Sequence, residues 1–255
     1  MQVVIIGSGN TATVLGKLIQ QSGHQIVQVM SNTLQHAQTL ATQLNTTASN
    51  NFQAINQNAD VYIIAVSDNA VASVAERLQL PGRLVVHTAG STSKEILKNV
   101  SAQYGVLWPL QTLRKETAHI PAMPFIIDGN DEATINNIKS FAATLSTTIE
   151  FADDDDRQKL HLAAVMASNF TNHFYALAEY FCEKESLDFK LIVPLIIETA
   201  ERIRQTSPAD VQTGPAARTD IVTIDKHLKL LDSHPYLKRL YLRISNSIME
   251  TVFKK

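Results

Sequence analysis

A histidine and several small polar side chains recur at helical spacing in the second half of the sequence. Ser168, Asn169 and Asn172 follow His161 at offsets of seven, eight and eleven residues within an otherwise apolar stretch. Those offsets place the side chains on one face of a helix. A histidine exchanges protons near neutral pH, and an amide can orient a reacting oxygen or nitrogen. The pattern favours an acid–base site, and structural hydrogen bonding is the alternative.

A second candidate group lies in the segment Thr213–Asp220, where a glycine and a proline interrupt helical structure. Arg218 carries a planar guanidinium that can bind two oxygens of a carboxylate or phosphate at once. It would hold an anionic substrate, and a structural salt bridge is the alternative. We expect Asp220 to cap the following helix rather than to react.

A glycine-rich turn near the N-terminus follows four β-branched apolar residues, Val3–Ile6. The spacing is that of the dinucleotide-binding fingerprint, in which one glycine permits a tight turn and the next lets a pyrophosphate approach the backbone. The N–H groups of the helix that begins near residue 10 would bind the phosphates. We therefore expect a nucleotide to bind at Gly7, Ser8, Gly9, Asn10, Thr11 and Ala12.

The residues after the second expected strand, over 24–30, bear on the choice between NAD and NADP. An acid at this position would bind the ribose 2′-hydroxyl and repel a 2′-phosphate. The sequence instead has Ser31, Asn32 and Thr33, which are neutral. These side chains favour NADP, with NAD as the alternative, although they could equally serve to cap the next helix.

Further apolar runs over 60–66, 83–87, 105–111, 123–129 and 147–151 predict a parallel sheet of about eight strands. Ligands of such sheets bind beyond the carboxyl ends of the strands. Asp68 could equally be a helix cap, and His87 could be a buried structural residue. The candidates by position are Val66, Ser67, Asp68, His87, Thr88 and Ser91.

From residue 152 the apolar residues follow the helical period almost to the end of the chain. We therefore predict an α/β fold in two domains: an NAD(P)-binding Rossmann-type parallel-sheet domain over 1–151 and an all-helical domain over 152–255. The expected helices cover 154–184, 188–205 with a bend at Pro194, 220–231 and 235–253. The acids Asp153–Asp156 are expected to complement the dipole of the first helix, and we predict no metal site.

Composition limits the classes of function. With 18% charged residues, 45% hydrophobic residues and a formal net charge of −2, the chain lacks the basic character of a nucleic-acid-binding protein. Cys182 is the one cysteine, so no disulfide forms within the chain. No apolar run approaches the roughly 20 residues that span a bilayer, and the N-terminus does not resemble a signal peptide. We expect a cytoplasmic protein without nucleic-acid or membrane partners.

The sequence also resembles an uncharacterised bacterial family over nearly its whole length. That family joins a Rossmann-like domain to a helical C-terminal domain of unknown function, and its members are labelled NADP oxidoreductases. The wider architecture is similar to pyrroline-5-carboxylate reductase and to the 6-phosphogluconate and hydroxyacid dehydrogenases. The resemblance implies NADP, a small-molecule substrate and a homodimer formed through the helical domain. The segments that carry it are His87–Ser91, Trp108–Thr112, His161–Asn169, Pro194–Thr199, Thr213–Asp220 and Thr223–His227.

One departure concerns the acid–base residue. In the hydroxyacid dehydrogenases a lysine lies four residues before the asparagine that Asn169 resembles, and here Val165 occupies that place. We expect an NAD(P)-dependent oxidoreductase that transfers hydride between the nicotinamide and a small carbonyl, imine or hydroxyl compound in the cleft between the domains. His161 would relay the proton, Asn169 would orient the substrate, and Arg218 would hold its anionic group. One alternative is a non-catalytic NADP-binding or regulatory protein. Another is a Rossmann protein that binds a different nucleotide, such as a flavin or a nucleoside diphosphate.

Overall fold

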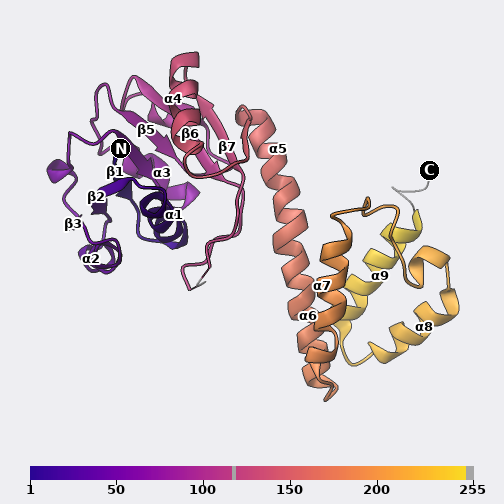
Figure 1. Cartoon of the computed structure of the whole chain (residues 1–255). Helices are drawn as coiled ribbons and strands as arrows, with labels where there is room; N and C mark the ends of the chain where they lie inside the picture. The colour runs from indigo at the N-terminus through magenta and orange to yellow at the C-terminus, as the bar shows by residue number, and fades with distance from the viewer. Residues whose placement is uncertain (117–118, 251–255) are drawn as a thin grey trace. The chain divides into compact units, whose positions relative to one another are not determined.

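The computed structural model describes residues 1–116 and 119–250. The chain divides into two compact units, Met1–Asn169 and Phe170–Lys255, and Figure 1 traces the elements of each. This division falls after the expected domain boundary at residue 151, because helix α5 (Asp154–Ala164) groups with the sheet. No helix in the described part of the chain is long and apolar enough to cross a membrane.

The first unit is built on an eight-stranded sheet in the order β3-β2-β1-β4-β5-β6-β7-β8. All neighbouring strands are parallel except β6 and β7, which confirms the predicted Rossmann-type α/β fold. The order reverses direction at β1, so the crevice for a ligand opens beyond the carboxyl ends of β1 and β4. The strands are β1 (Gln2–Ile6), β2 (Gln25–Met30), β3 (Thr47–Ser49), β4 (Val61–Ile64), β5 (Leu84–His87), β6 (Gln103–Pro109), β7 (Phe125–Gly129) and β8 (Ile149–Phe151).

Two apolar layers hold the sheet, because successive side chains of a strand point to opposite faces. Val3 and Ile5 of β1 pack into the layer that includes α1 (Asn10–Gln21), α2 (Leu34–Gln43) and α4 (Glu132–Ala142). Val4 and Ile6 pack into the opposite layer, which includes α3 (Val71–Ala75). Both faces are therefore covered, as the continuous apolar runs of the central strands predict.

The predicted long helix consists of α5, a π-helical stretch at Val165–Phe170 and α6 (Thr171–Lys184). The second unit continues with α7 (Val193–Arg202), α8 (Ile221–Leu230) and α9 (Pro235–Glu250). The expected continuation of the last helix to residue 253 lies outside the described residues.

The expectation of a bend at Pro194 is wrong. A 3₁₀ turn covers Phe189–Leu191, and α7 begins only at Val193, so Pro194 lies in the first turn of the helix. A proline is tolerated there because the N–H that it lacks would have no partner within the helix.

Candidate functional site

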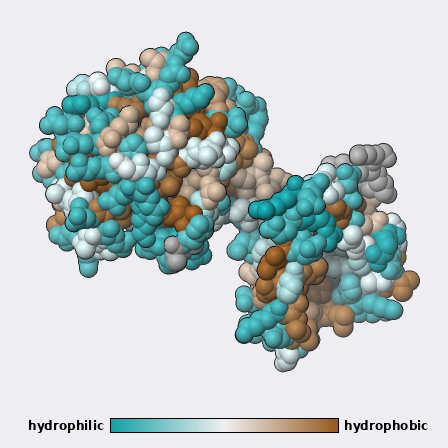
Figure 2. All heavy atoms as spheres, in the orientation of Figure 1, coloured by the Kyte–Doolittle hydropathy of each residue, from teal (hydrophilic) through white to brown (hydrophobic). Residues whose placement is uncertain are grey.

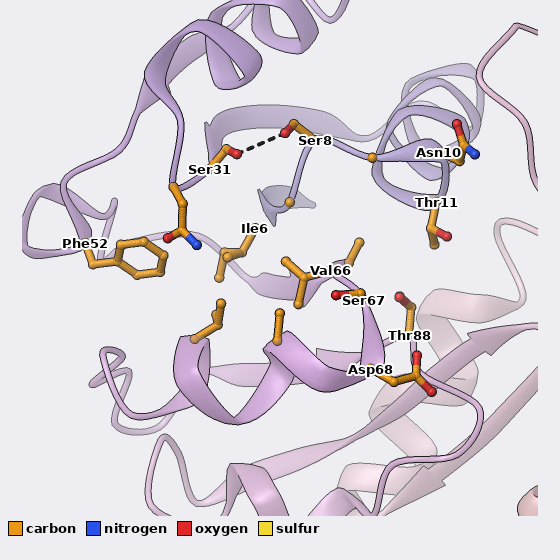
Figure 3. Close-up of a pocket in the computed structure, with 16 residues that line it drawn as sticks. Ile6, Ser8, Asn10, Thr11, Ser31, Phe52, Val66, Ser67, Asp68 and Thr88 are labelled. Carbon is orange, nitrogen blue, oxygen red and sulfur yellow. Dashed lines mark hydrogen bonds between the residues drawn. The ribbon is translucent and has the colours of Figure 1, made fainter.

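A cavity of about 440 Å³ opens at the carboxyl ends of β1, β2 and β4 (Figure 3). Most of the residues predicted for the cofactor line it, together with residues from the segment that follows β4 and from α3, which the fingerprint alone does not indicate. The lining residues are Ile6, Gly7, Ser8, Gly9, Asn10, Thr11, Ser31, Asn32, Phe52, Ala65, Val66, Ser67, Asp68, Ala70, Val74 and Thr88.

The two glycines of the turn have different roles. Gly7 has a φ of +130°, and a Cβ there would collide with the carbonyl oxygen of Ala65, so the close approach of β1 and the β4 loop requires glycine. Gly9 caps α1 without a side-chain hydrogen bond, and a Cβ there would meet no atom within 4 Å. The N-terminus of α1 is therefore unobstructed, and this arrangement fits a pyrophosphate.

Polar contacts connect the turn to the neighbouring strand. The hydroxyl oxygens of Ser8 and Ser31 are 2.9 Å apart, and the bond joins the glycine turn to the end of β2 (Figure 3). Asn32 accepts a hydrogen bond through its Oδ1 from Nη1 of Arg77 at 2.7 Å. Arg77 lies 45 residues further along the chain, and no local signal in the sequence associates it with the cofactor.

Three of the predicted cofactor residues do not line this cavity. Ala12 is fully buried in the sheet core, which agrees with the packing role of the third small residue of the fingerprint. Thr33 is exposed at the N-terminus of α2 and makes no capping bond through its side chain. His87 is also absent from the lining, whereas the next residue, Thr88, contributes to it.

His87 is 0% exposed because it ends a strand that is covered on both faces. Its Nδ1 accepts a hydrogen bond from the N–H of Ala89 at 3.2 Å, and its Nε2 is buried without a partner. Burial, and to a smaller extent the charge of Arg157, lowers the pKa of His87 to about 4. The imidazole is therefore neutral at pH 7, and the structure places it in the sheet rather than at the cofactor.

A second cavity, of about 450 Å³, is lined by His161, Ser168 and Asn169 of the predicted polar stripe, whereas Asn172 does not line it. The π-helical stretch widens the helical turn at Ser168 and Asn169, and such stretches are frequent at functional sites. The hydroxyl oxygens of Ser168 and Thr112 are 2.9 Å apart. The lining residues, all in the first unit, are Trp108, Leu110, Gln111, Thr112, Leu160, His161, Ala163, Ala164, Val165, Ala167, Ser168 and Asn169.

The loop that follows β5 connects the two cavities. The rings of His161 and Trp108 meet edge to face, with their centroids 5.7 Å apart. A Cβ on Gly90 would lie 2.7 Å from Cε2 of Trp108 and 3.0 Å from Nδ1 of His161, so only glycine leaves room for both rings. Thr88, two residues earlier, lines the first cavity. His161 therefore packs against the same short loop that closes one end of the nucleotide cavity.

A buried charge network fixes the start of α5. Arg157 is 1% exposed, and its Nη2 donates to the carbonyl oxygen of Thr92 at 2.7 Å and to the carboxylate of Asp154. Asp128 of β7 lies 3.6 Å from Nη1 of Arg157 and accepts a 2.7 Å hydrogen bond from Lys94. These contacts tie α5 to the loop after β5, and this arrangement sets the position of His161 one turn further along the helix.

The acids at the start of α5 also have structural partners. Asp153 caps the helix by accepting a hydrogen bond from the N–H of Asp156, which confirms the expected role of the acidic run. Burial alone would raise the pKa of Asp154, but hydrogen bonds from Ser93 and Arg157 lower it overall. Within residues 1–116 and 119–250, no group of three or more histidines, cysteines or acids is placed to hold a metal ion.

Arg218 belongs to the second unit. It ends a 3₁₀ turn at Ala216–Arg218, and its side chain is exposed. Asp220 caps α8 by accepting a hydrogen bond from the N–H of Thr223 at 3.0 Å, as predicted. The hydrogen bonds from Thr223 lower the pKa of Asp220, and the charge of Arg218 lowers it further. The exposed guanidinium therefore lies near the carboxylate of Asp220, and within residues 1–116 and 119–250 it forms no ion pair with an acid.

Comparison with known proteins agrees with this architecture. A family model described as NADP oxidoreductase coenzyme F420-dependent matches residues 2–91, and the domain of unknown function DUF2520 matches residues 123–248. Among solved structures, a Bacteroides fragilis protein provisionally described as an NADP oxidoreductase is 38% identical, covers 98% of both chains and has a TM-score of 0.90. Among curated proteins, no sequence matches significantly.

Two more distant structures share the fold. The reductive aminase of Aspergillus terreus, solved with NADPH and ethyl-5-oxohexanoate, is 15% identical over 98% of this chain and 93% of its own, with a TM-score of 0.72. The 1-pyrroline-5-carboxylate reductase of Streptococcus pyogenes is 15% identical over 98% of this chain and 99% of its own, with a TM-score of 0.66.

Proposed function

Because the chain belongs to the family of NADP oxidoreductases that join an NADP-binding domain to a DUF2520 domain, we propose that it transfers hydride between NADP(H) and a small carbonyl, imine or hydroxyl compound. The observation that carries this proposal is the contact of His161 with the loop after β5. That loop begins at Thr88, in the nucleotide cavity, and reaches the polar cavity at Gly90. A proton donor and a dinucleotide would therefore meet across one short segment of chain.

The residues of the second cavity supply the acid–base half of the reaction. When bound, the reduced nicotinamide supplies a hydride to the substrate carbon. His161 gives a proton from a ring nitrogen to the substrate oxygen or nitrogen, and because its side chain is half-buried it regains the proton from solvent. Trp108 restricts the imidazole through its edge-to-face contact, and the amide of Asn169 orients the reacting heteroatom. In the reverse direction His161 accepts the proton of a hydroxyl or amine.

Steady-state oxidation of NADPH with a panel of keto acids, ketones and cyclic imines tests the proposal. His161→Gln should lower kcat about 100- to 10,000-fold, which is the usual contribution of a general acid, while leaving the affinity for NADPH unchanged. His119→Gln is the matched control, because this exposed histidine lines neither the nucleotide cavity nor the cavity of His161. Equal turnover by wild type and His161→Gln would exclude His161 as the proton donor.

Arg218 is proposed to bind the carboxylate or phosphate of the substrate through its exposed guanidinium. Arg218→Lys keeps the charge but loses the paired donors, so it should raise KM for an anionic substrate about tenfold and leave KM for a neutral one unchanged. An equal change for both substrates would contradict the assignment.

A non-catalytic NADP-binding protein is the second candidate, and Val165 favours it. This valine lies in the wall of the polar cavity at the position where the dehydrogenases that the sequence resembles carry a lysine. Calorimetry decides between the candidates together with the substrate panel. Tight NADPH binding without turnover of any compound would favour the regulatory function over the enzyme.

The helical unit is proposed to form a homodimer. Its described residues leave many large apolar side chains in water, among them Leu191 at 80% exposed and Val222 at 67%. Figure 2 shows apolar side chains, in brown, gathered on the visible face of this unit. Patches of this kind mark interaction surfaces. Light scattering should give twice the chain mass, and Leu195→Asp, at another exposed apolar position, should shift it toward that of a monomer. A monomeric wild type would contradict the proposal.

A further inference from the structure

Arg77, just beyond the end of α3, holds its guanidinium against two residues of the nucleotide cavity. Its Nη1 donates to Oδ1 of Asn32 at 2.7 Å. Its Cζ lies 3.7 Å from the centroid of the Phe52 ring, within the range of a cation–π contact. Asn32 and Phe52 both line the cavity. No carboxylate pairs with Arg77 among the described residues, so its charge remains available to a ligand.

The position of Phe52 identifies the end of the cavity that Arg77 serves. In Figure 3, Phe52 and Ser31 lie toward one end, whereas Asp68 and Thr88 lie toward the other. The Thr88 end adjoins the loop that contacts His161, so it suits the reactive ring of the dinucleotide. The Phe52 end is then left for the adenosine. It also includes the residues that follow β2, which is where a Rossmann fold distinguishes the ribose 2′ substituents.

We propose that Arg77 binds the 2′-phosphate of NADP(H) and thereby selects this cofactor over NAD(H); the inference rests on the proposed function. The guanidinium has five N–H donors, and the bond to Asn32 uses one of them. The remaining donors can meet two oxygens of a phosphate. Asn32 and Phe52 hold the planar group in place before the ligand arrives, which reduces the entropy lost on binding.

The segment Ser31–Thr33 contains no acid to repel the phosphate, but it contains no cation to attract it either. Arg77 supplies that missing charge from a distant part of the chain. The hydroxyl of Ser31, which precedes Asn32 in the sequence, is already bonded to that of Ser8. Specificity for the phosphate therefore depends on a contact between two loops rather than on the residues after β2 alone.

Calorimetry on the full chain tests the proposal with NADPH, NADH, 2′,5′-ADP and 5′-ADP. Arg77→Gln should weaken the binding of NADPH and of 2′,5′-ADP about 10- to 100-fold, because it removes a charge-assisted pair of hydrogen bonds. The affinities for NADH and 5′-ADP should change less than about twofold, since neither ligand carries the 2′-phosphate. Arg77→Lys should retain part of the preference. Arg83→Gln is the matched control, as it removes the same charge from the same unit outside the cavity.

The outcomes separate this inference from the proposed function. If Arg77→Gln weakens NADPH and NADH equally, Arg77 only supports the shape of the cavity and the assignment is overturned. Unchanged affinities for all four ligands also overturn it, and in that case turnover of NADPH by wild type would leave the proposed function standing. A wild type that binds 2′,5′-ADP but turns over no substrate would support the Arg77 site and count against the oxidoreductase. Binding of neither NADPH nor NADH would overturn both.

Discussion

Lowering the pH from 7.5 to 5 should destabilise the sheet unit through His87, which is buried at the end of β5. The pKa of His87 is lowered to about 4 from an ordinary value of 6.5, first by burial and then by the charge of Arg157. Below about pH 6.5 the imidazole of His87 therefore binds a proton in the unfolded chain but stays neutral in the folded chain. Stability is complete above this value and is lost progressively as the pH falls toward 4.

The size of the effect follows from the shift in pKa. A difference between 6.5 and about 4 corresponds to about 3 kcal/mol of unfolding free energy once both states are protonated. At pH 5 His87 is almost fully protonated in the unfolded state but not in the folded state, so about 2 kcal/mol of unfolding free energy should already be lost. The carboxyl groups of Asp131 and Asp154, whose pKa values are lowered, contribute only below their ordinary value of 3.8. Their titration therefore lies outside the range between pH 7.5 and 5.

Urea unfolding followed by Trp108 fluorescence measures this loss, because the chain has one tryptophan and it lies in the sheet unit. His87→Asn keeps an acceptor for the N–H of Ala89 but cannot titrate, so its stability should change little between pH 7.5 and 5. His24→Gln is the matched control. Partial burial and the N-terminal ammonium also lower the pKa of His24, but this variant should keep most of the wild-type slope. An identical loss in wild type and His87→Asn would refute the reasoning.

Three further predictions concern the site and its support. Gly90→Ala should push Trp108 and His161 apart and lower kcat about 10- to 100-fold in steady-state kinetics. The affinity for NADPH, measured by calorimetry, should stay the same. An unchanged kcat would mean that the two rings tolerate the methyl group. Arg157→Met leaves the buried carboxylate of Asp128 with one cation fewer, so it should lower the free energy of unfolding in urea by about 3–5 kcal/mol. A decrease below about 1 kcal/mol would show that the charge network is dispensable for stability. NADPH at 100 times its Kd should stabilise the sheet unit by about 2.7 kcal/mol in the same assay, and no stabilisation would contradict specific binding.

The sequence predicted those features that depend on residues close together in the chain. The turn at Gly7 and Gly9 follows from the steric limits of a strand–turn–helix connection, which act within a few residues. Helical periodicity places His161, Ser168 and Asn169 on one face, and the structure brings all three to one cavity. The cap at Asp220 is local as well, since it bonds an N–H three residues away.

Only the tertiary structure decided which distant residues meet. The strand order brings Arg77 to Asn32 and Gly90 to Trp108 and His161, across separations at which no periodicity carries information. It also encloses His87, which the sequence predicted at the cofactor, with a buried structural role as the alternative. The physical reason is that turns, caps and helix faces arise from short-range geometry, whereas burial and charge pairing depend on how the sheet layers pack. The local pattern therefore predicted the glycine turn and the helix face that we propose for the nucleotide and the proton donor, and the packing determined which residues surround them.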